Sequence, residues 1–282
     1  MNRTNRIIPS ALLIAALLAG TSSQLTPSLF AQDATTRPTA TTRPAPVLRF
    51  EAPDVATPKV TRSGQPDAGF MRAHNQYVAM AKGGNIDLYM LGDSITDFWQ
   101  HTHKANWDKS FAGWKTGDFG ISGDRTQHVL WRLQNGELDG VAPKVIVLLI
   151  GTNNLPQNTT YLENTVPDTF KGVKAIIDLL KEKEPQAHIL LMAVFPRGDT
   201  AKSSTPLMDR VNELNTMIAT LDDGKQVKFL NINNQLADTD GKLIPGVMGR
   251  DNLHPSDKGY TIWAEAMRPI LTEWLGPPAA TP

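Results

Sequence analysis

The stretch IDLYMLGDSIT, residues 86–96, decides the fold. Its first six residues form a short, largely apolar run that is rich in β-formers, as is typical of a strand buried on both faces of a parallel sheet. Ser94 follows where this strand would end and a helix would begin. At such a junction a hydroxyl can face solvent and a backbone N–H can face an oxyanion, although a serine there also serves simply as a helix cap.

Further stretches follow the same pattern along the chain. Val145–Ile150 and Ile189–Phe195 are apolar runs bounded by Gly, Pro or polar residues, and Asp118–Ile121 and Val227–Ile232 are weaker candidates. Helical periodicities lie between the runs. The alternation predicts an α/β protein, a three-layer α/β/α sandwich of flavodoxin-like type with a parallel sheet of about five strands.

Three apolar stripes at helical spacing predict the helices that cover this sheet. They span Phe170–Leu180, Leu207–Leu221 and Tyr260–Trp274. Ser256 is expected to cap the third helix, and Pro269 is expected to kink it. All three stripes are interpreted as core faces rather than as binding surfaces.

Composition excludes several classes of site. The 282 residues contain no cysteine, which removes disulfides, zinc–thiolate sites and thiol nucleophiles. Twenty-eight Lys and Arg residues balance twenty-eight Asp and Glu residues, so no global field points to nucleic acid as a partner. Any nucleophile must therefore be an oxygen or a nitrogen.

The N-terminal part indicates export. Residues 1–31 combine an early basic region with a nine-residue apolar run, which is too short to span a bilayer and is typical of a secretory signal peptide. Residues 32–46 form a Thr/Pro-rich linker, in which the sequence TTRP occurs twice. We expect the folded domain at 47–276, a disordered tail at 277–282, and a periplasmic or extracellular protein with no stable membrane span after cleavage.

Polar residues follow the other predicted strands. Asn153 lies just after Val145–Ile150, and Gly123 lies in the loop after Asp118–Ile121. Asp251 and His254 are three residues apart on a loop before the last helix, a spacing that lets the carboxylate receive the imidazole Nδ1–H. Each signal alone also has an ordinary structural explanation. Because strand C-termini meet at one edge of a parallel sheet, we expect these groups to converge there.

These blocks resemble those of the SGNH, or GDSL, hydrolase family, from about Ile86 to Leu275. The segment from Phe119 to Asn154 resembles the branch related to platelet-activating-factor acetylhydrolase catalytic subunits. The resemblance implies Ser94 as nucleophile, His254 as base and Asp251 as the third triad member. It also implies an oxyanion hole made by the Ser94 and Gly123 N–H groups and the Asn153 amide. Ser122 stands where many relatives have glycine.

The activity expected from this reading is hydrolysis of short-chain acyl esters, preferably acetyl esters on carbohydrate, without a metal or organic cofactor. A lysophospholipase, thioesterase or phospholipid acetylhydrolase is the alternative enzyme. A non-catalytic carbohydrate-binding module is the alternative outside enzymes. A nucleotide-binding protein is disfavoured because no phosphate-binding loop is present. The sequence does not indicate an oligomeric state.

Three further features of the sequence suggest other sites. Ser122 does not lie in a G-x-S-x-G motif, so it is not predicted as a nucleophile. His101 and His103 could bind a metal, but we expect a solvated loop without acidic partners. The aromatic residues around Phe98, Trp99, Trp107, Phe111 and Trp114 could line a sugar or acyl site, but core packing is the preferred interpretation.

Overall fold

The computed structural model describes residues 51–61, 63–155, 164–198 and 206–280. The chain divides into two compact units, Met1–Ala45 and Pro46–Pro282, and every described residue belongs to the second. The predicted signal peptide (1–31) and linker (32–46) therefore lie outside the described residues. Within the described part, no helix has the length and apolar character that crossing a bilayer requires.

Five parallel strands form one sheet in the order β2-β1-β3-β4-β5, which is the flavodoxin-like order. The strands are β1 Leu88–Gly92, β2 Thr116–Gly120, β3 Val145–Leu149, β4 His188–Met192 and β5 Val227–Leu230. The predicted α/β sandwich is confirmed, and all five apolar runs form strands. The strand ends differ from the predicted ones by at most three residues, and the largest difference is that β4 ends at Met192 rather than at Phe195.

The register aligns the C-terminal ends of the three strands that precede the predicted site residues. Gly92 of β1 lies level with Gly120 of β2 and with Leu149 of β3. The loop after β2 is tied to the end of β1, since the Ile121 N–H donates to the Gly92 carbonyl at 3.2 Å. These loops therefore leave the sheet at one edge.

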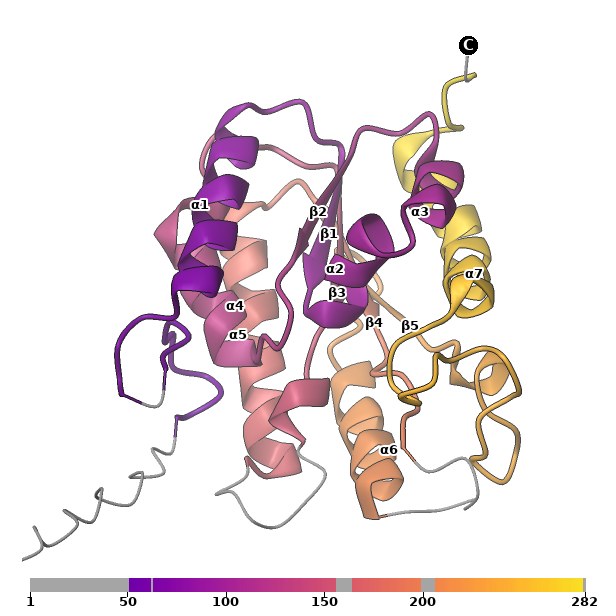
Figure 1. Cartoon of the computed structure of the whole chain (residues 1–282). Helices are drawn as coiled ribbons and strands as arrows, with labels where there is room; N and C mark the ends of the chain where they lie inside the picture. Colours follow the sequence, from indigo (N-terminus) through magenta and orange to yellow (C-terminus); the bar gives the residue numbers. More distant parts are fainter. Residues whose placement is uncertain (1–50, 62, 156–163, 199–205, 281–282) are drawn as a thin grey trace, which may run out of the picture. The chain divides into compact units, whose positions relative to one another are not determined.

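Helices cover both faces of the sheet, with α1, α4 and α5 on one side and α3 and α7 on the other (Figure 1). The helices are α1 Ala68–Lys82, α2 Ser94–His101, α3 Lys104–Phe111, α4 Thr126–Arg132, α5 Val166–Lys183, α6 Pro206–Ala219 and α7 Asp257–Leu275. The three predicted helical stripes lie on α5, α6 and α7. Ser256 caps α7 as predicted, accepting from the Gly259 N–H at 3.3 Å. The helix continues through Pro269.

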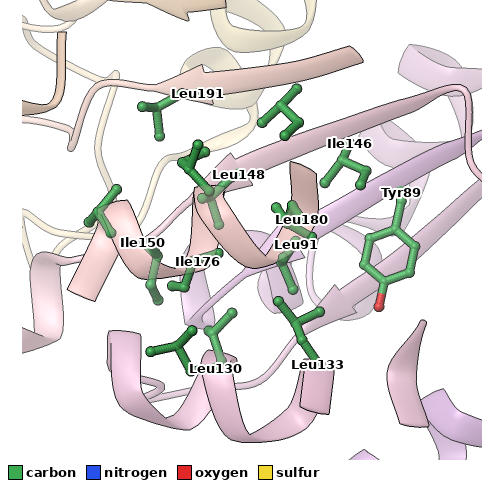
Figure 2. Close-up of a cluster of buried hydrophobic side chains, with 14 of the residues drawn as sticks. Tyr89, Leu91, Leu130, Leu133, Ile146, Leu148, Ile150, Ile176, Leu180 and Leu191 are labelled. Atoms are coloured by element: carbon green, nitrogen blue, oxygen red, sulfur yellow. The ribbon is translucent and has the colours of Figure 1, made fainter. Parts of the chain in front are cut away.

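Alternate residues of each strand enter two separate cores. On one face Tyr89, Leu91, Ile146 and Leu148 pack against α4 and α5, and Figure 2 shows this cluster. On the other face Leu88, Met90, Val145 and Val147 pack in the core that α2, α3 and α7 cover. A strand with both faces buried has no polar side, which explains the continuous apolar runs in the sequence.

Two features differ from the sequence-based expectation. Helix α1 was not predicted, because its residues carry no strong apolar stripe; the Asp67 side chain begins it by accepting from the Phe70 N–H at 2.8 Å. The start of the predicted disordered tail is bound to the domain, since the Ala279 N–H donates to the Gly113 carbonyl at 3.0 Å.

Candidate active site

Ser94 occupies the first turn of α2, directly after β1. Asp93 caps this helix, and its Oδ1 accepts from the Ile95 N–H at 2.9 Å. Gly92 makes the tight junction possible, because an added Cβ would lie 2.2 Å from the Thr96 hydroxyl and 2.7 Å from the Leu149 carbonyl. Ser94 itself is 8 % exposed. The turn thus holds a seryl hydroxyl at a helix N-terminus, near the surface of the molecule.

His254 and Asp251 reach Ser94 from the loop before α7. The His254 Nε2 lies 2.8 Å from the Ser94 Oγ, and its Nδ1 lies 2.6 Å from the Asp251 Oδ2. The Asp251 Oδ1 also accepts from the His254 and Leu253 N–H groups, both at 3.1 Å. The carboxylate therefore fixes its own loop as well as the imidazole ring.

This arrangement assigns the tautomer of His254. With a carboxylate at Nδ1 and a hydroxyl at Nε2, the neutral ring carries its proton on Nδ1 and accepts from Ser94 at Nε2. Burial raises the pKa of Asp251, but the hydrogen bonds from His254 outweigh that effect and hold the pKa below its usual value. The Phe98 ring stacks on the imidazole with a centroid distance of 4.5 Å, which restricts its rotation.

Gly123 lies in the loop after β2, between two anchored residues. Lys59 donates to the Ser122 carbonyl at 2.7 Å and pairs with the Asp124 carboxylate at 3.0 Å. The Asp124 N–H closes the turn onto the Ile121 carbonyl at 3.0 Å. Gly123 adopts φ +75°, a left-handed conformation that glycine reaches without a Cβ penalty. The loop is therefore held from both sides of Gly123.

Asn153 lies in a short 3₁₀ turn, Thr152–Asn154, after β3. Its Nδ2 donates to the Asp124 carbonyl at 2.9 Å and to the Asp93 Oδ2 at 3.3 Å. The Asn153 amide thus joins the loop that carries Gly123 to the residue that precedes Ser94. Burial raises the pKa of Asp93 to about 7, although the Ile95 N–H opposes the shift.

A fully buried ion network holds the loop that carries Gly123. The Arg132 Nε lies 2.8 Å from the Asp124 Oδ2, and its other nitrogens bond to Glu137 and to the Phe119 and Gly92 carbonyls. Arg132, Asp124 and Glu137 are each 0 % exposed. Burial works to lower the pKa of Arg132, but the two carboxylates raise it above its ordinary value. Removing Arg132 would take away the guanidinium that both buried carboxylates share.

Sequence reasoning missed two cations at this edge. Arg197, just beyond β4, donates to the Thr152 carbonyl at 3.0 Å and to its hydroxyl at 2.7 Å, and so holds the turn that carries Asn153. Its position after a predicted strand was a usable signal. Lys59 lies before the first predicted strand, and no periodic pattern marks it.

Ser122, His101 and His103 bond to carboxylates outside the proposed triad. The Ser122 hydroxyl donates to the Asp97 carboxylate. The expectation that His101 and His103 lack acidic partners was wrong, because each Nδ1 meets a carboxylate, Asp97 at 2.8 Å and Asp257 at 2.7 Å. Among the described residues, no group of three or more His, Asp or Glu side chains could hold a metal ion.

The aromatic residues after Ser94 belong mostly to the core. Trp99, Trp107 and Phe111 are buried and pack on one another in edge-to-face contacts. Trp114 is partly buried against the same core. Phe98 differs, because it stacks on the His254 ring.

Sequence comparison relates the chain to ester hydrolases. A profile of the GDSL-like lipase/acylhydrolase family matches residues 90–262. The alpha1 subunit of platelet-activating factor acetylhydrolase IB from Homo sapiens is 33 % identical over 220 residues, covering 77 % of this chain and 89 % of the relative. The alpha2 subunit from Bos taurus is 35 % identical over 226 residues, covering 78 % and 91 %.

Solved structures with the same fold are also hydrolases. A GDSL-like lipase from Bacteroides thetaiotaomicron superposes with a TM-score of 0.55 at 21 % identity, covering 72 % of this chain and 97 % of that one. An acetyl xylan esterase superposes with a TM-score of 0.53 at 20 % identity, covering 66 % and 100 %.

Proposed function

The chain belongs to the GDSL-like lipase/acylhydrolase family, and on that premise we propose that it is a serine esterase that removes short acyl groups, above all acetyl, from carbohydrate esters. The observation that carries the proposal is the continuous hydrogen-bonded line from Ser94 through His254 to Asp251, with distances of 2.8 and 2.6 Å. Nucleophile, base and orienting acid within hydrogen-bond reach are the requirements for covalent acyl transfer.

In the acylation step, the Ser94 Oγ forms a bond to the ester carbonyl carbon while its proton passes to the His254 Nε2. The intermediate then collapses, the bond from carbon to the alcohol oxygen breaks, and Nε2 returns the proton to the departing alcohol. Asp251, kept ionised by its hydrogen bonds, stabilises the imidazolium and retains the ring orientation without taking the proton.

In the deacylation step, water takes the place of the alcohol. Its proton passes to Nε2, its oxygen bonds to the acyl carbon, and the bond to the Ser94 Oγ breaks as the proton returns to that oxygen. In both steps the negative charge on the carbonyl oxygen is stabilised by the Ser94 and Gly123 N–H groups and by the Asn153 amide. Of the two hydrogen bonds that the Asn153 amide donates, the one to Asp93 is longer, at 3.3 Å. We therefore assign the amide hydrogen of this bond as the one that contacts the carbonyl oxygen of the substrate.

The proposed acetyl preference is supported by the names of three of the compared proteins. The relatives from Homo sapiens and Bos taurus are named acetylhydrolases, and a protein with the same fold is an acetyl xylan esterase. We further propose export, as the N-terminal residues predict, which would place the enzyme with polysaccharides outside the cytoplasm.

A p-nitrophenyl ester series from C2 to C12, run beside acetylated xylan, tests the proposal. We expect the wild type to prefer the C2 ester and to release acetate from xylan, and Ser94→Ala to lose at least the greater part of both activities. A folded Ser94→Ala that retains wild-type turnover would remove Ser94 from the mechanism. A maximum at long chains would contradict the acetyl preference.

The named relatives favour one second candidate, an acetylhydrolase that acts on phospholipid. Both candidates share the acyl step and differ in the alcohol. Comparing kcat/KM for an acetylated phosphocholine lipid with that for acetylated xylo-oligosaccharides separates them.

A further inference from the structure

A cavity of about 480 Å³, lined by none of the proposed catalytic residues, has no role in the proposed mechanism. Its walls come from α1, from α2 and from the loop after β2, and include Ala73, Gln76, Asp97 and Ser122. Its volume falls in the range of small-molecule sites in proteins.

Two wall residues place this cavity next to the reacting atoms. Ser122 immediately precedes Gly123, the proposed oxyanion donor. Asp97 lies three residues after Ser94 on α2, and side chains at that spacing have Cβ atoms about 5–6 Å apart. The Ser122 hydroxyl donates to Asp97, so the two walls are joined. A group attached to an ester at Ser94 therefore needs only a short reach to enter the cavity.

The charged side chains of the cavity already have partners. The Lys59 ammonium pairs with Asp124 and donates to the Ser122 carbonyl, and the His101 ring pairs with Asp97. A phosphate would therefore have to compete with carboxylates for both of these cations. A hydroxyl group meets no such competition. It can donate to the lone pairs that remain free on each carboxylate, and the exposed Gln76 amide can both donate to it and accept from it. The lining suits a neutral group with many hydroxyls.

We propose that this cavity is the subsite for the alcohol part of the substrate, and that it binds a neutral sugar ring adjoining the acetylated one. The inference rests on the proposed esterase function and specifies which side of the ester the enzyme recognises. Binding energy from such a remote group raises kcat/KM only for substrates that carry it.

Ala73→Trp tests the proposal by filling the cavity from α1, where Ala73 is half-buried. We expect kcat/KM for acetylated xylo-oligosaccharides to fall about tenfold, mainly through KM, while p-nitrophenyl acetate hydrolysis stays within about twofold of wild type. Ala79→Trp is the matched control, because Ala79 lies exposed on the same helix outside the cavity. The control should leave kcat/KM unchanged for both substrates.

Several outcomes would overturn the subsite. Equal loss on both substrates would show that Ala73→Trp disturbs the oxyanion loop rather than sugar binding, and no loss on either would show that the cavity is unused. A selective loss on an acetylated phosphocholine lipid would assign the cavity to a lipid headgroup. Binding of deacetylated xylo-oligosaccharide to Ser94→Ala, with and without Ala73→Trp, is measured by calorimetry. Because that experiment needs no turnover, failure of the subsite and failure of the esterase function are distinguishable.

Discussion

Asn153→Ala is the most informative single change, because the Asn153 amide is the one side-chain donor assigned to the oxyanion. The structure gives this amide two acceptors, the Asp124 carbonyl at 2.9 Å and the Asp93 carboxyl at 3.3 Å. The shorter bond holds the side chain in place, and the longer one supplies the hydrogen that a developing oxyanion would attract. Truncation removes both.

The expected loss is about 10²–10³ in kcat, or about 3–4 kcal/mol of transition-state stabilisation, as for removal of one oxyanion donor elsewhere. KM should change little, since a neutral ester carbonyl accepts only a weak hydrogen bond in the ground state. The loss of two hydrogen bonds should also lower the free energy of unfolding, by about 1–3 kcal/mol.

The assay is steady-state hydrolysis of p-nitrophenyl acetate beside urea unfolding. Asn106→Ala is the matched control, because the Asn106 side chain also makes several hydrogen bonds, to Trp99, Asp257 and Thr261. The control should lose stability but keep kcat. A folded Asn153→Ala that retains more than about a third of kcat would refute the assignment, because an oxyanion donor contributes far more than that.

Two further predictions concern stability. Arg132→Met should lower the free energy of unfolding by about 3–5 kcal/mol in urea titrations, because it removes the guanidinium that the buried Asp124 and Glu137 carboxylates share. Lys59 still pairs with Asp124, so most of the cost falls on Glu137, and Arg132→Met with Glu137→Gln should recover part of it. A loss below about 1 kcal/mol would argue against the network. Burial raises the pKa of Glu184 to about 7, so its contribution to stability is present at low pH and is lost as the pH rises through 7. Glu184→Gln should therefore raise the free energy of unfolding by about 1 kcal/mol at about pH 8, a value reduced to allow for the partial exposure of the side chain, and should leave it unchanged at about pH 4. An equal change in the free energy of unfolding at both pH values would contradict the raised pKa of Glu184.

The strands and the residues at their ends could be predicted from sequence because their signals are local. An apolar run such as Val145–Ile150 identifies a strand buried on both faces, and parallel strands bring their C-terminal loops to one edge. Asp251 and His254 are close in sequence, so their contact needs little chain closure.

The partners of the supporting charges could not be predicted, because these pairs join distant segments. Lys59 reaches Ser122 across 63 residues and Arg197 reaches Thr152 across 45, and neither pairing leaves a periodic trace. The acidic partner of His103, Asp257, is 154 residues away. Helix α1 was missed because a histidine, His74, interrupts the apolar residues on its buried side.

The level ends of β2, β1 and β3 set the dimensions of the catalytic centre. Neighbouring strands lie about 4.8 Å apart, a spacing fixed by main-chain hydrogen bonds rather than by side-chain volume. Because β1 lies between the other two, the segments bearing Gly123 and Asn153 leave the sheet on opposite flanks of the segment bearing Ser94. Exchanges among Val, Ile and Leu in the two cores therefore leave the distances between these three segments unchanged. The core residues can diverge widely while the geometry of catalysis is retained.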